Sequence, residues 1–312
     1  MRATDLLGCV GPAIILLFSS TFIPFLGPFL TLLTPIPFLY YTTKLGLQHG
    51  LKIVVVAILA VALVANFTGN PQIIFLCVEF SLLGLILSEI FKKRFTLGLT
   101  IFWGTAFMLV LGACVLIFIS ITKSTGPLDL ILSYLDNNFK QAIGMYETMG
   151  SDQDKIRQLQ EYAKVLKYVI TRIYPALMVI GTAFVVWINV VISRPLFHIR
   201  NLRYPDFGPI DRWHSPDLMI WGVIVAGFSL FLSIAGVKLL AINALIVMLA
   251  IYAFHGLSIV LFYFNKYRVP PWVRFGVYLI IIFQQIFLVL LAMAGLFDQW
   301  IDFRKIHKKP TG

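Results

Sequence analysis

The sequence predicts an all-α integral membrane protein, a polytopic bundle of about nine transmembrane helices. Of its 312 residues, 59% are hydrophobic and 12% are charged, whereas about 25% are charged in an ordinary soluble domain. Several windows of about 20 residues contain almost no charge, which is the length that a helix needs to cross about 30 Å of hydrocarbon. The alternation of polar and apolar residues typical of membrane β-barrels is absent, so we expect the spans to be helices.

Nine apolar runs give the expected helices in order. They lie near residues 6–25, 28–43, 50–67, 71–91, 95–122, 168–193, 217–236, 239–265 and 271–297. The first run lacks a clear small-residue cleavage site and leads directly into further apolar sequence, so we interpret it as a retained helix and not as a signal peptide. The runs divide the chain into a six-helix membrane core at 1–194 with an outer segment at 124–165, a cytoplasmic loop at 195–216, and a three-helix C-terminal membrane region at 217–312.

Basic residues indicate which loops face the cytoplasm, because Lys and Arg gather on that side. They fill the turns after the second, fourth, sixth and eighth runs, at Lys44, Lys52, Lys92, Lys93, Arg94, Arg194, Arg200, Arg203, Arg212, Lys266, Arg268 and Arg274. These turns alternate correctly if the N-terminus is cytoplasmic, and segment 124–165, with six acids and four bases, then lies outside. The tail "RKIHKK" (Arg304–Lys309) disagrees, since nine spans place it outside. Either one span is miscounted or the upstream signals overrule the tail.

The outer segment ends in a predicted amphipathic helix, "SDQDKIRQLQEYAKVLKYVI" (Ser151–Ile170), that leads into the sixth span. Its apolar residues Ile156, Leu159, Ala163 and Leu166 recur at roughly helical spacing. Such a helix could cap a cavity from outside or rest on the membrane surface. Both interpretations remain open.

The formal net charge of +11 requires no nucleic-acid partner. Positive-inside loops and attraction to anionic lipid headgroups account for most of this charge. We therefore expect membrane lipids as partners and no nucleic acid.

Two ionisable residues within the apolar runs suggest a ligand site. Glu79 lies about eight residues from the outer end of its helix, roughly 12 Å deep, and Arg172 lies about one turn inside the outer end of the sixth span. We expect the two side chains to face one another across an outward-facing cavity that holds a polar ligand, with Trp187 and Asn189 lining the same cavity. The alternative is a buried ion pair, or a neutral carboxyl, with no ligand.

A second candidate binding site lies in the proline-containing run Gly27–Gly46. Pro28, Pro35 and Pro37 interrupt this run, and a broken helix at membrane depth is tolerated where it lines a cavity or is buried in protein. Thr34, Pro35 and Pro37 are the candidate residues. A kink between packed helices is the alternative.

The remaining polar residues and the missing motifs argue against enzymatic chemistry. His255, Gln284 and Gln285 are of the type that bonds neighbouring helices, and the cysteines Cys9, Cys77 and Cys114 lie in apolar runs as small packing residues. The chain contains no phosphate loop, HExxH or GxSxG motif, and no His, Cys and Asp cluster at metal-ligand spacing. We expect no enzyme activity, no cofactor and no metal.

The C-terminal half resembles the YybS-like family of bacterial multi-pass membrane proteins, a domain of unknown function. The resemblance rests on "DRWHSPDLMIWGVIVAG" (Asp211–Gly227), "NALIVMLAIYAFHGLSIVLFYFNK" (Asn243–Lys266) and "GLFDQWIDFRK" (Gly295–Lys305). In that family a Pro-Asp or similar turn introduces a Trp-bearing helix, an Asn opens the next helix, a Gln/His-Gly pair lies inside it, and Gly-Leu-x-Asp closes the last. The resemblance extends over nearly the whole chain. Asn243, His255 and Asp298 match these positions, and the resemblance implies a bacterial inner-membrane location.

The first six predicted helices also resemble the substrate-binding components of energy-coupling-factor transporters and, more distantly, the rod-shape protein MreD. The shared pattern is a cytoplasmic N-terminus, six spans, a proline-containing second segment and a long outer loop before the sixth helix. The resemblance implies uptake of a small solute with a separate ATPase module as partner. The AxxxA docking motif is missing, since Ala13 has no alanine four residues away, and this departure counts against docking to a shared module.

The leading functional hypothesis is therefore binding and translocation of a small solute. In that hypothesis Glu79 recognises a positive or hydrogen-bond-donating group, Arg172 recognises an anionic group, and Asn189 and Trp187 orient the ligand. The alternative is a non-transporting cell-envelope scaffold similar to MreD, in which the polar residues only fix helix packing and the loops recruit partners.

Overall fold

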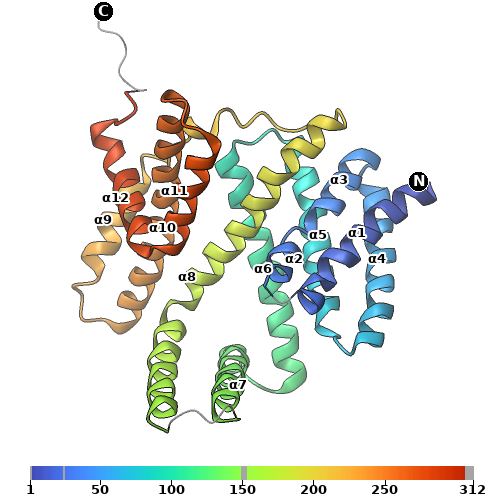
Figure 1. Ribbon diagram of the computed structural model, residues 1–312, viewed down its shortest axis with the longest axis horizontal. Coiled ribbons are helices and arrows are strands. Elements are labelled where there is room, and N and C mark those ends of the chain that lie inside the picture. Colours follow the sequence, from blue (N-terminus) through green and yellow to red (C-terminus); the bar gives the residue numbers. More distant parts are fainter. Residues whose placement is uncertain (1, 24, 149–152, 306–312) are drawn as a thin grey trace, which may run out of the picture. The chain divides into compact units, whose positions relative to one another are not determined.

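The structure is a computed structural model that describes residues 2–23, 25–148 and 153–305. These residues form α-helices and one short 3-10 helix, with no strand among them (Figure 1). The predicted all-α class is therefore confirmed. The elements are α1 (Ala3–Phe22), α2 (Gly27–Thr31), α3 (Pro35–Leu45), α4 (Leu47–Thr68), α5 (Gln72–Lys92), α6 (Leu97–Lys123), α7 (Pro127–Thr148), α8 (Gln153–Ile199), η1 (Ile210–Arg212), α9 (Met219–Ser229), α10 (Ala235–Lys266), α11 (Pro271–Phe283) and α12 (Gln285–Ile301).

The chain divides into two compact units. Unit 1 comprises residues 1–131 and 181–207, and unit 2 comprises residues 132–180 and 208–312. Helix α8 therefore contributes its first part to unit 2 and its second part to unit 1. The three membrane regions expected from the sequence, divided at 194 and 216, stay a prediction.

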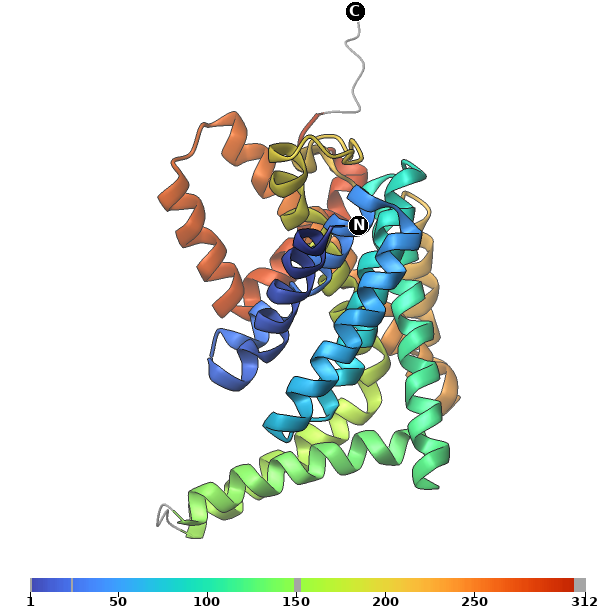
Figure 2. The ribbon, with the colours of Figure 1, turned by 90° about the vertical axis from the view of Figure 1, so that its right-hand side faces the viewer.

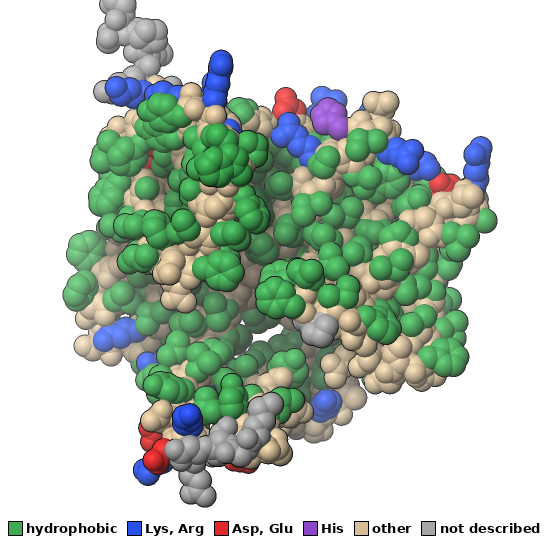
Figure 3. All heavy atoms as spheres, viewed as in Figure 1, with side chains coloured by type: hydrophobic (Ala, Val, Ile, Leu, Met, Phe, Trp, Pro, Cys, Tyr) green, Lys and Arg blue, Asp and Glu red, His purple; other side chains and the backbone are tan. Residues whose placement is uncertain are grey.

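Six helices in the described part of the chain are long and apolar enough to cross a membrane, namely α1, α4, α5, α6, α8 and α10. The pair α11 and α12 adds a seventh span only if its two bent halves count as one. The expectation of nine spans is thus not confirmed in the described residues and stays a prediction. The outer faces of the helices are rich in hydrophobic side chains, which cover most of the surface seen in Figure 3, as expected for faces that contact lipid.

Three predicted spans differ from the structure, each for a local reason. Residues 28–43 form the short helices α2 and α3, because the prolines at 28, 35 and 37 lack the N–H that helix continuity needs. Residues 217–236 form only the 11-residue α9 before the chain turns into α10. Residues 271–297 form the two helices α11 and α12, bent by 102° at Gln284, whose backbone is extended with φ −109° and ψ 100°. A helix of 11 residues is about 17 Å long and cannot cross the hydrocarbon alone.

The core of unit 1 lies among α1, α3, α4 and α5. Its buried cluster comprises Cys9, Val10, Ala13, Phe38, Ile53, Val54, Ala57 and Leu85. Gly84 permits α5 to approach α3 closely, because a Cβ there would lie 2.6 Å from the Cβ of Phe38 and 2.7 Å from the carbonyl oxygen of Pro35. Cys9 and Cys77 are buried, as a packing role requires, whereas Cys114 is exposed.

One end of unit 1 combines basic residues with an aromatic cluster. The cluster consists of Tyr40, Phe91, Phe197, Tyr204 and Phe207, whose rings contact one another edge to face at centroid distances of 5.4 to 6.2 Å. Burial raises the pKa of the Tyr204 phenol above its ordinary value, so the hydroxyl stays protonated and donates to the carbonyl of Val190 at 2.7 Å. Because Lys92, Arg194 and Arg203 adjoin cluster residues in the chain, they gather at the same end.

Helices α7 and α8 form a helical pair in unit 2 (Figures 1 and 2). The Lys167 ammonium on α8 lies 2.7 Å from the Asp136 carboxylate on α7. The predicted amphipathic helix over 151–170 is confirmed from Gln153 onward, and it continues without interruption into the sixth predicted span. Residues 151 and 152 lie outside the described part of the chain.

Candidate functional site

Glu79 lies half-buried on α5, next to exposed apolar residues such as Phe75 and Leu76. Its carboxylate has no hydrogen-bond or ion-pair partner among the residues that the structure describes. Glu79 belongs to unit 1 and Arg172 to unit 2, so their predicted meeting across a cavity stays a prediction.

Asn189 and Trp187 lie on the part of α8 that belongs to unit 1. Asn189 is completely buried, and its side-chain nitrogen donates to the carbonyls of Leu32 and Val185, each at 2.8 Å. Leu32 follows the last residue of α2, so this bond satisfies a carbonyl freed where the second predicted span breaks. The Trp187 ring lies 5.8 Å from the ring of Phe184. The Asn189 donors are thus used in helix packing.

The second predicted site, at Thr34, Pro35 and Pro37, is filled by protein contacts. All three residues are buried, and the Thr34 hydroxyl donates to the carbonyl of Thr31 at 2.6 Å. The hydroxyls of Ser19 and Thr31 both donate to the carbonyl of Gly27, at 2.8 and 3.1 Å. Here the structure shows the kink between packed helices that the sequence left open as the alternative.

Asn243 bridges α10 to α8 beside a proline. Pro175 has no N–H and removes one backbone hydrogen bond from α8. One position further on, the N–H of Ala176 donates to the Asn243 side-chain oxygen at 2.9 Å, and the Asn243 nitrogen donates to the carbonyl of Arg172 at 2.8 Å. In an uninterrupted helix Ala176 and Arg172 would bond to each other. The amide of Asn243 therefore supplies partners to both groups at a proline-weakened point of α8, which is the kind of interhelical bond predicted for polar residues in spans.

His255 and Asp298, two of the positions expected from the family resemblance, belong to one buried cluster in unit 2. The cluster consists of Ser215, His255, Ser258, Asp298 and Arg304, each at most 7% exposed. His255 Nε2 lies 3.0 Å from Asp298 Oδ2, and Arg304 Nη2 lies 2.9 Å from the same oxygen. Arg304 Nη1 also donates to the carbonyls of Asp211 and Trp213, each at 3.0 Å. The cluster thus ties the loop before α9 to the ends of α10 and α12.

Donors and acceptors of this buried cluster meet both nitrogens of the His255 ring. The backbone N–H of Ser215 points to His255 Nδ1 at 3.5 Å, and the Ser215 hydroxyl lies 3.1 Å from the same nitrogen. Nε2 lies 3.0 Å from Asp298 Oδ2, which as a carboxylate accepts, and 2.9 Å from Arg304 Nη2, which can only donate, so these contacts agree with either tautomer. Gln299 donates to the Ser215 oxygen at 3.3 Å. The residue types match a nucleophilic triad, but Ser215 is completely buried, and this burial favours a packing role over attack on a substrate.

Sequence reasoning singled out His255 and Asp298 but missed Ser215 and Arg304. Arg304 was treated only as part of the basic tail, of which residues 306–309 lie outside the described range. Its burial follows from its position six residues after Asp298, where the chain leaves α12 through Asp302 in the left-handed region at φ 46°. The sequence signal for this buried pair is Asp298 near the end of an apolar run, followed six residues later by Arg304.

Helices α11 and α12 form a V whose two ends lie at the same end of unit 2 (Figure 2). Arg274, in the first turns of α11, donates to the carbonyl of Phe264 near the end of α10 at 3.1 Å. At the other end of the V, Phe303 just beyond α12 accepts from the Tyr263 hydroxyl of α10 at 2.8 Å. The chain therefore enters and leaves this pair beside the C-terminal end of α10. Gln284 and Gln285 lie at the bend and are both exposed.

Close packing against α10 holds α12 in this position. A Cβ on Gly256 of α10 would overlap the backbone carbonyl of Leu291, and a Cβ on Gly295 of α12 would overlap the backbone carbonyl of Tyr252. The two glycines let the backbones of the two helices touch, as small residues do between membrane helices. Contact at Tyr252 and Gly295, and again at Tyr263 and Phe303, shows that the two helices run in the same direction.

Comparison with known proteins shows which family of membrane proteins the chain belongs to. The family described as "Predicted membrane protein (DUF2232)" matches residues 13–299. The "Uncharacterized protein YybS" of Bacillus subtilis (strain 168) is 20% identical over 292 residues, which cover 91% of each chain. No solved structure matches the chain. The expected relation to YybS is confirmed, and the chain is a multi-pass membrane protein that belongs to the DUF2232 family of predicted membrane proteins.

Proposed function

We propose that the chain binds a small polar solute and moves it across the membrane. The observation that carries this proposal is the V formed by α11 and α12. The chain enters this V and leaves it at the same end of unit 2. Non-helical backbone at membrane depth is tolerated where it is buried or lines a water-filled cavity, and broken helices form the substrate sites of many transporters. Gln284 and Gln285 supply amide donors and acceptors at the bend.

Glu79 gives the proposal its second support. A carboxylate near the centre of a span costs about 2.5 to 3.5 kcal/mol on insertion scales, and such residues usually mark substrate, ion or proton paths. Because Glu79 has no hydrogen-bond or ion-pair partner in the described part of the chain, its cost is not offset by an internal cation. In the proposal it binds a positive or hydrogen-bond-donating group of the solute.

The proposal places the chain in the bacterial cytoplasmic membrane with its N-terminus inside. The support is the gathering of basic residues at one end of unit 1 and, in unit 2, of Lys266, Arg268 and Arg274 at the end of α10. The chain is assigned no catalytic step. A separate ATPase partner stays a prediction that follows from the resemblance alone.

The thermal stability of the detergent-purified chain tests solute binding against a panel of vitamins, metal ions and lipid precursors. A ligand that binds only the folded state adds about 2.7 kcal/mol at 100 times its dissociation constant. We expect one compound to stabilise the wild type and to lose this effect in Glu79→Gln and in the double variant Gln284→Ala with Gln285→Ala. Uptake of that compound into proteoliposomes would then test translocation.

Glu89→Gln is the matched control, because it removes a carboxylate from the same helix. Glu89 pairs at 2.5 Å with the exposed Lys92 at the end of α5, so its loss should leave ligand stabilisation unchanged. If no compound acts and Glu79→Gln is as stable as the wild type, the solute-binding proposal fails.

The second candidate function is a cell-envelope scaffold, and a specific observation favours it. Asn243, His255 and Asp298 have side-chain bonds inside the protein, and Asn189 donates both amide hydrogens there although its buried oxygen has no partner among the described residues. This is close to the pattern expected when polar residues only fix helix packing. In this case the loop after α8 would recruit partners. Stability that responds to no solute, together with a defined complex isolated through that loop, would support the scaffold.

A further inference from the structure

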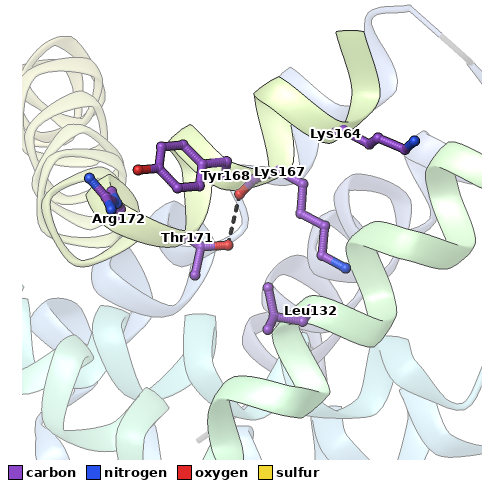
Figure 4. Close-up of a pocket in the computed structure, with 6 residues that line it drawn as sticks. All are labelled: Leu132, Lys164, Lys167, Tyr168, Thr171 and Arg172. Atoms are coloured by element: carbon purple, nitrogen blue, oxygen red, sulfur yellow. Dashed lines mark hydrogen bonds between the residues drawn. The ribbon is translucent and has the colours of Figure 1, made fainter. Parts of the chain in front are cut away.

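A groove in unit 2 between α7 and the first part of α8 has the chemistry of an anion site. Its volume is about 380 Å³, and it is lined by Leu132, Lys164, Lys167, Tyr168, Thr171 and Arg172 (Figure 4). Figure 4 shows Arg172 on one side of Tyr168 and Thr171, with Lys164 and Lys167 on the other side. The wall is formed largely by apolar atoms, and its polar groups are three cations and two hydroxyls, those of Lys164, Lys167, Arg172, Tyr168 and Thr171. The groove therefore suits a ligand with an anionic group and an apolar body.

The cations of the groove exceed the carboxylates that neutralise them. Asp136 accepts from Lys167 through both oxygens, at 2.8 and 2.7 Å. Lys164 and Arg172 are exposed and have no carboxylate partner among the described residues. The Thr171 hydroxyl donates to the carbonyl of Lys167 at 2.7 Å, so the cations of the groove without a carboxylate partner are Lys164 and Arg172. An anion bound there would meet two uncompensated positive charges.

Tyr168 orients the guanidinium of Arg172. The guanidinium carbon lies 4.2 Å from the centre of the Tyr168 ring, which is a cation–π contact. Stacking on a ring occupies the face of a guanidinium and leaves the N–H groups at its edge to donate. A planar fork of this kind matches the oxygens of a phosphate, to which arginine can donate two parallel hydrogen bonds.

The position of Arg172 along α8 places the groove at the level of lipid headgroups. The chain carries no Asp, Glu, Lys, Arg or His from Ile173 to Ser193, and these 21 residues are bounded by Arg172 and Arg194. As a helix they extend about 31 Å, which is close to the thickness of the hydrocarbon. Exposed tyrosines on α7 and α8, of the kind that mark membrane interfaces, lie at positions 134, 146, 162 and 168.

We propose that this groove binds the phosphate of an anionic phospholipid headgroup. The Arg172 fork donates to the phosphate, Lys164 adds a second positive charge, and Leu132 and the Tyr168 ring contact the glycerol and acyl portion. None of the residues of this site belongs to α5, α11 or α12, which hold Glu79, Gln284 and Gln285. Arg172 is shared, because the sequence also predicts that it recognises an anionic group of the solute. It also gives the α7–α8 pair a role at the membrane surface, one of the two interpretations left open for the outer segment.

Lipid titration of the delipidated full-length chain in a neutral detergent tests the site. Apparent melting temperature would be followed against phosphatidylglycerol, phosphatidylcholine with the same acyl chains, and inorganic phosphate. We expect saturable stabilisation by phosphatidylglycerol and little by the other two. In Arg172→Gln the apparent dissociation constant for phosphatidylglycerol should rise about tenfold, because a charge-assisted pair of hydrogen bonds is lost. Arg172→Lys, which keeps the charge without the fork, should lose less.

Arg157→Gln is the matched control, because it removes the same charge from the same helix. Arg157 is exposed, faces Glu161 at 4.0 Å and does not line the groove, so phosphatidylglycerol binding should stay within about twofold of wild type. Equal losses in Arg157→Gln and Arg172→Gln would overturn the site in favour of general attraction to a basic surface. Equal stabilisation by phosphatidylcholine, absence of any lipid effect, or wild-type binding by Arg172→Gln would also overturn it. If inorganic phosphate stabilises the chain as much as phosphatidylglycerol does, the groove binds a soluble anion and the proposal of a lipid ligand is overturned.

Discussion

Replacement of Asn243 by Leu tests whether this side chain repairs α8 beside Pro175. The change removes the partners of the Ala176 N–H and the Arg172 carbonyl. A buried backbone group without a partner costs about 1 to 3 kcal/mol, whereas single hydrogen bonds between membrane helices average about 0.6 kcal/mol. For two groups we expect the free energy of unfolding to fall by about 1 to 4 kcal/mol.

The informative comparison is the same replacement in a Pro175→Ala background. Alanine at 175 restores an N–H to α8 and removes the ring that opens the helix, so Ala176 can bond to the Arg172 carbonyl directly. Asn243→Leu should then cost much less, and the double-mutant cycle should give a coupling of at least about 1 kcal/mol.

The assay is denaturant titration of the full chain in detergent, followed by circular dichroism and tryptophan fluorescence. Asn138→Leu is the control, because Asn138 is exposed on α7 and bonds only to the carbonyl of Tyr134 in its own helix. It should change the free energy of unfolding by no more than about 0.5 kcal/mol. Effects of Asn243→Leu and Pro175→Ala that simply add within about 0.5 kcal/mol would refute the repair role.

Three further predictions concern unit 2 and one exposed ion pair, with the same unfolding assay as the measurement. Asp298→Ala leaves the buried Arg304 without its carboxylate and should lower the free energy of unfolding by about 3 to 5 kcal/mol; a loss below about 1 kcal/mol would contradict the buried pair. Glu89→Ala breaks only a pair at the helix end and should cost about 0 to 1 kcal/mol. Gly256→Ala places a methyl group against the carbonyl of Leu291 and should cost about 1 to 3 kcal/mol, so wild-type stability would argue against close contact of α10 with α12.

The sequence predicts the fold class and most span positions well, because an uncharged run of about 20 residues leaves the chain few alternatives to a helix. Helices α1, α4, α5, α6 and α10 agree with the predicted runs to within a few residues. The failures share one cause, since a run of apolar residues does not say whether the helix inside it is continuous. The prolines indicate the break before α3, whereas no proline or glycine lies at the bend at Gln284.

The sequence identifies individual polar residues of the candidate site, but it does not identify the partners to which they bond. Asn243, His255 and Asp298 stand out as polar residues in apolar runs, and each is part of a hydrogen-bond network. Their partners are separated from them by up to 71 residues, as for Asn243 and the carbonyl of Arg172. The hydropathy of a sequence does not indicate which distant backbone carbonyl a side chain will bond to. Arg304 escaped notice for a different reason, because a surface charge in a basic tail and a buried counterion of Asp298 look the same in sequence.

The bend at Gln284 also bears on the position of the basic tail, which nine continuous spans would place outside. A ninth continuous span would carry the chain from the end of α10 to the opposite side of the membrane, and Arg304 and Lys305 would then lie away from Lys266 and Arg268. In the structure the V returns the chain to the end of α10, where Arg304 bonds to the carbonyls of Asp211 and Trp213. In unit 2, Arg304 and Lys305 therefore lie at the same end as Lys266 and Arg268, and the side of the membrane that they face stays a prediction. A cysteine introduced at Lys305 should be labelled by impermeant reagents from the same side as one introduced at Lys266, and labelling from opposite sides would restore the continuous span.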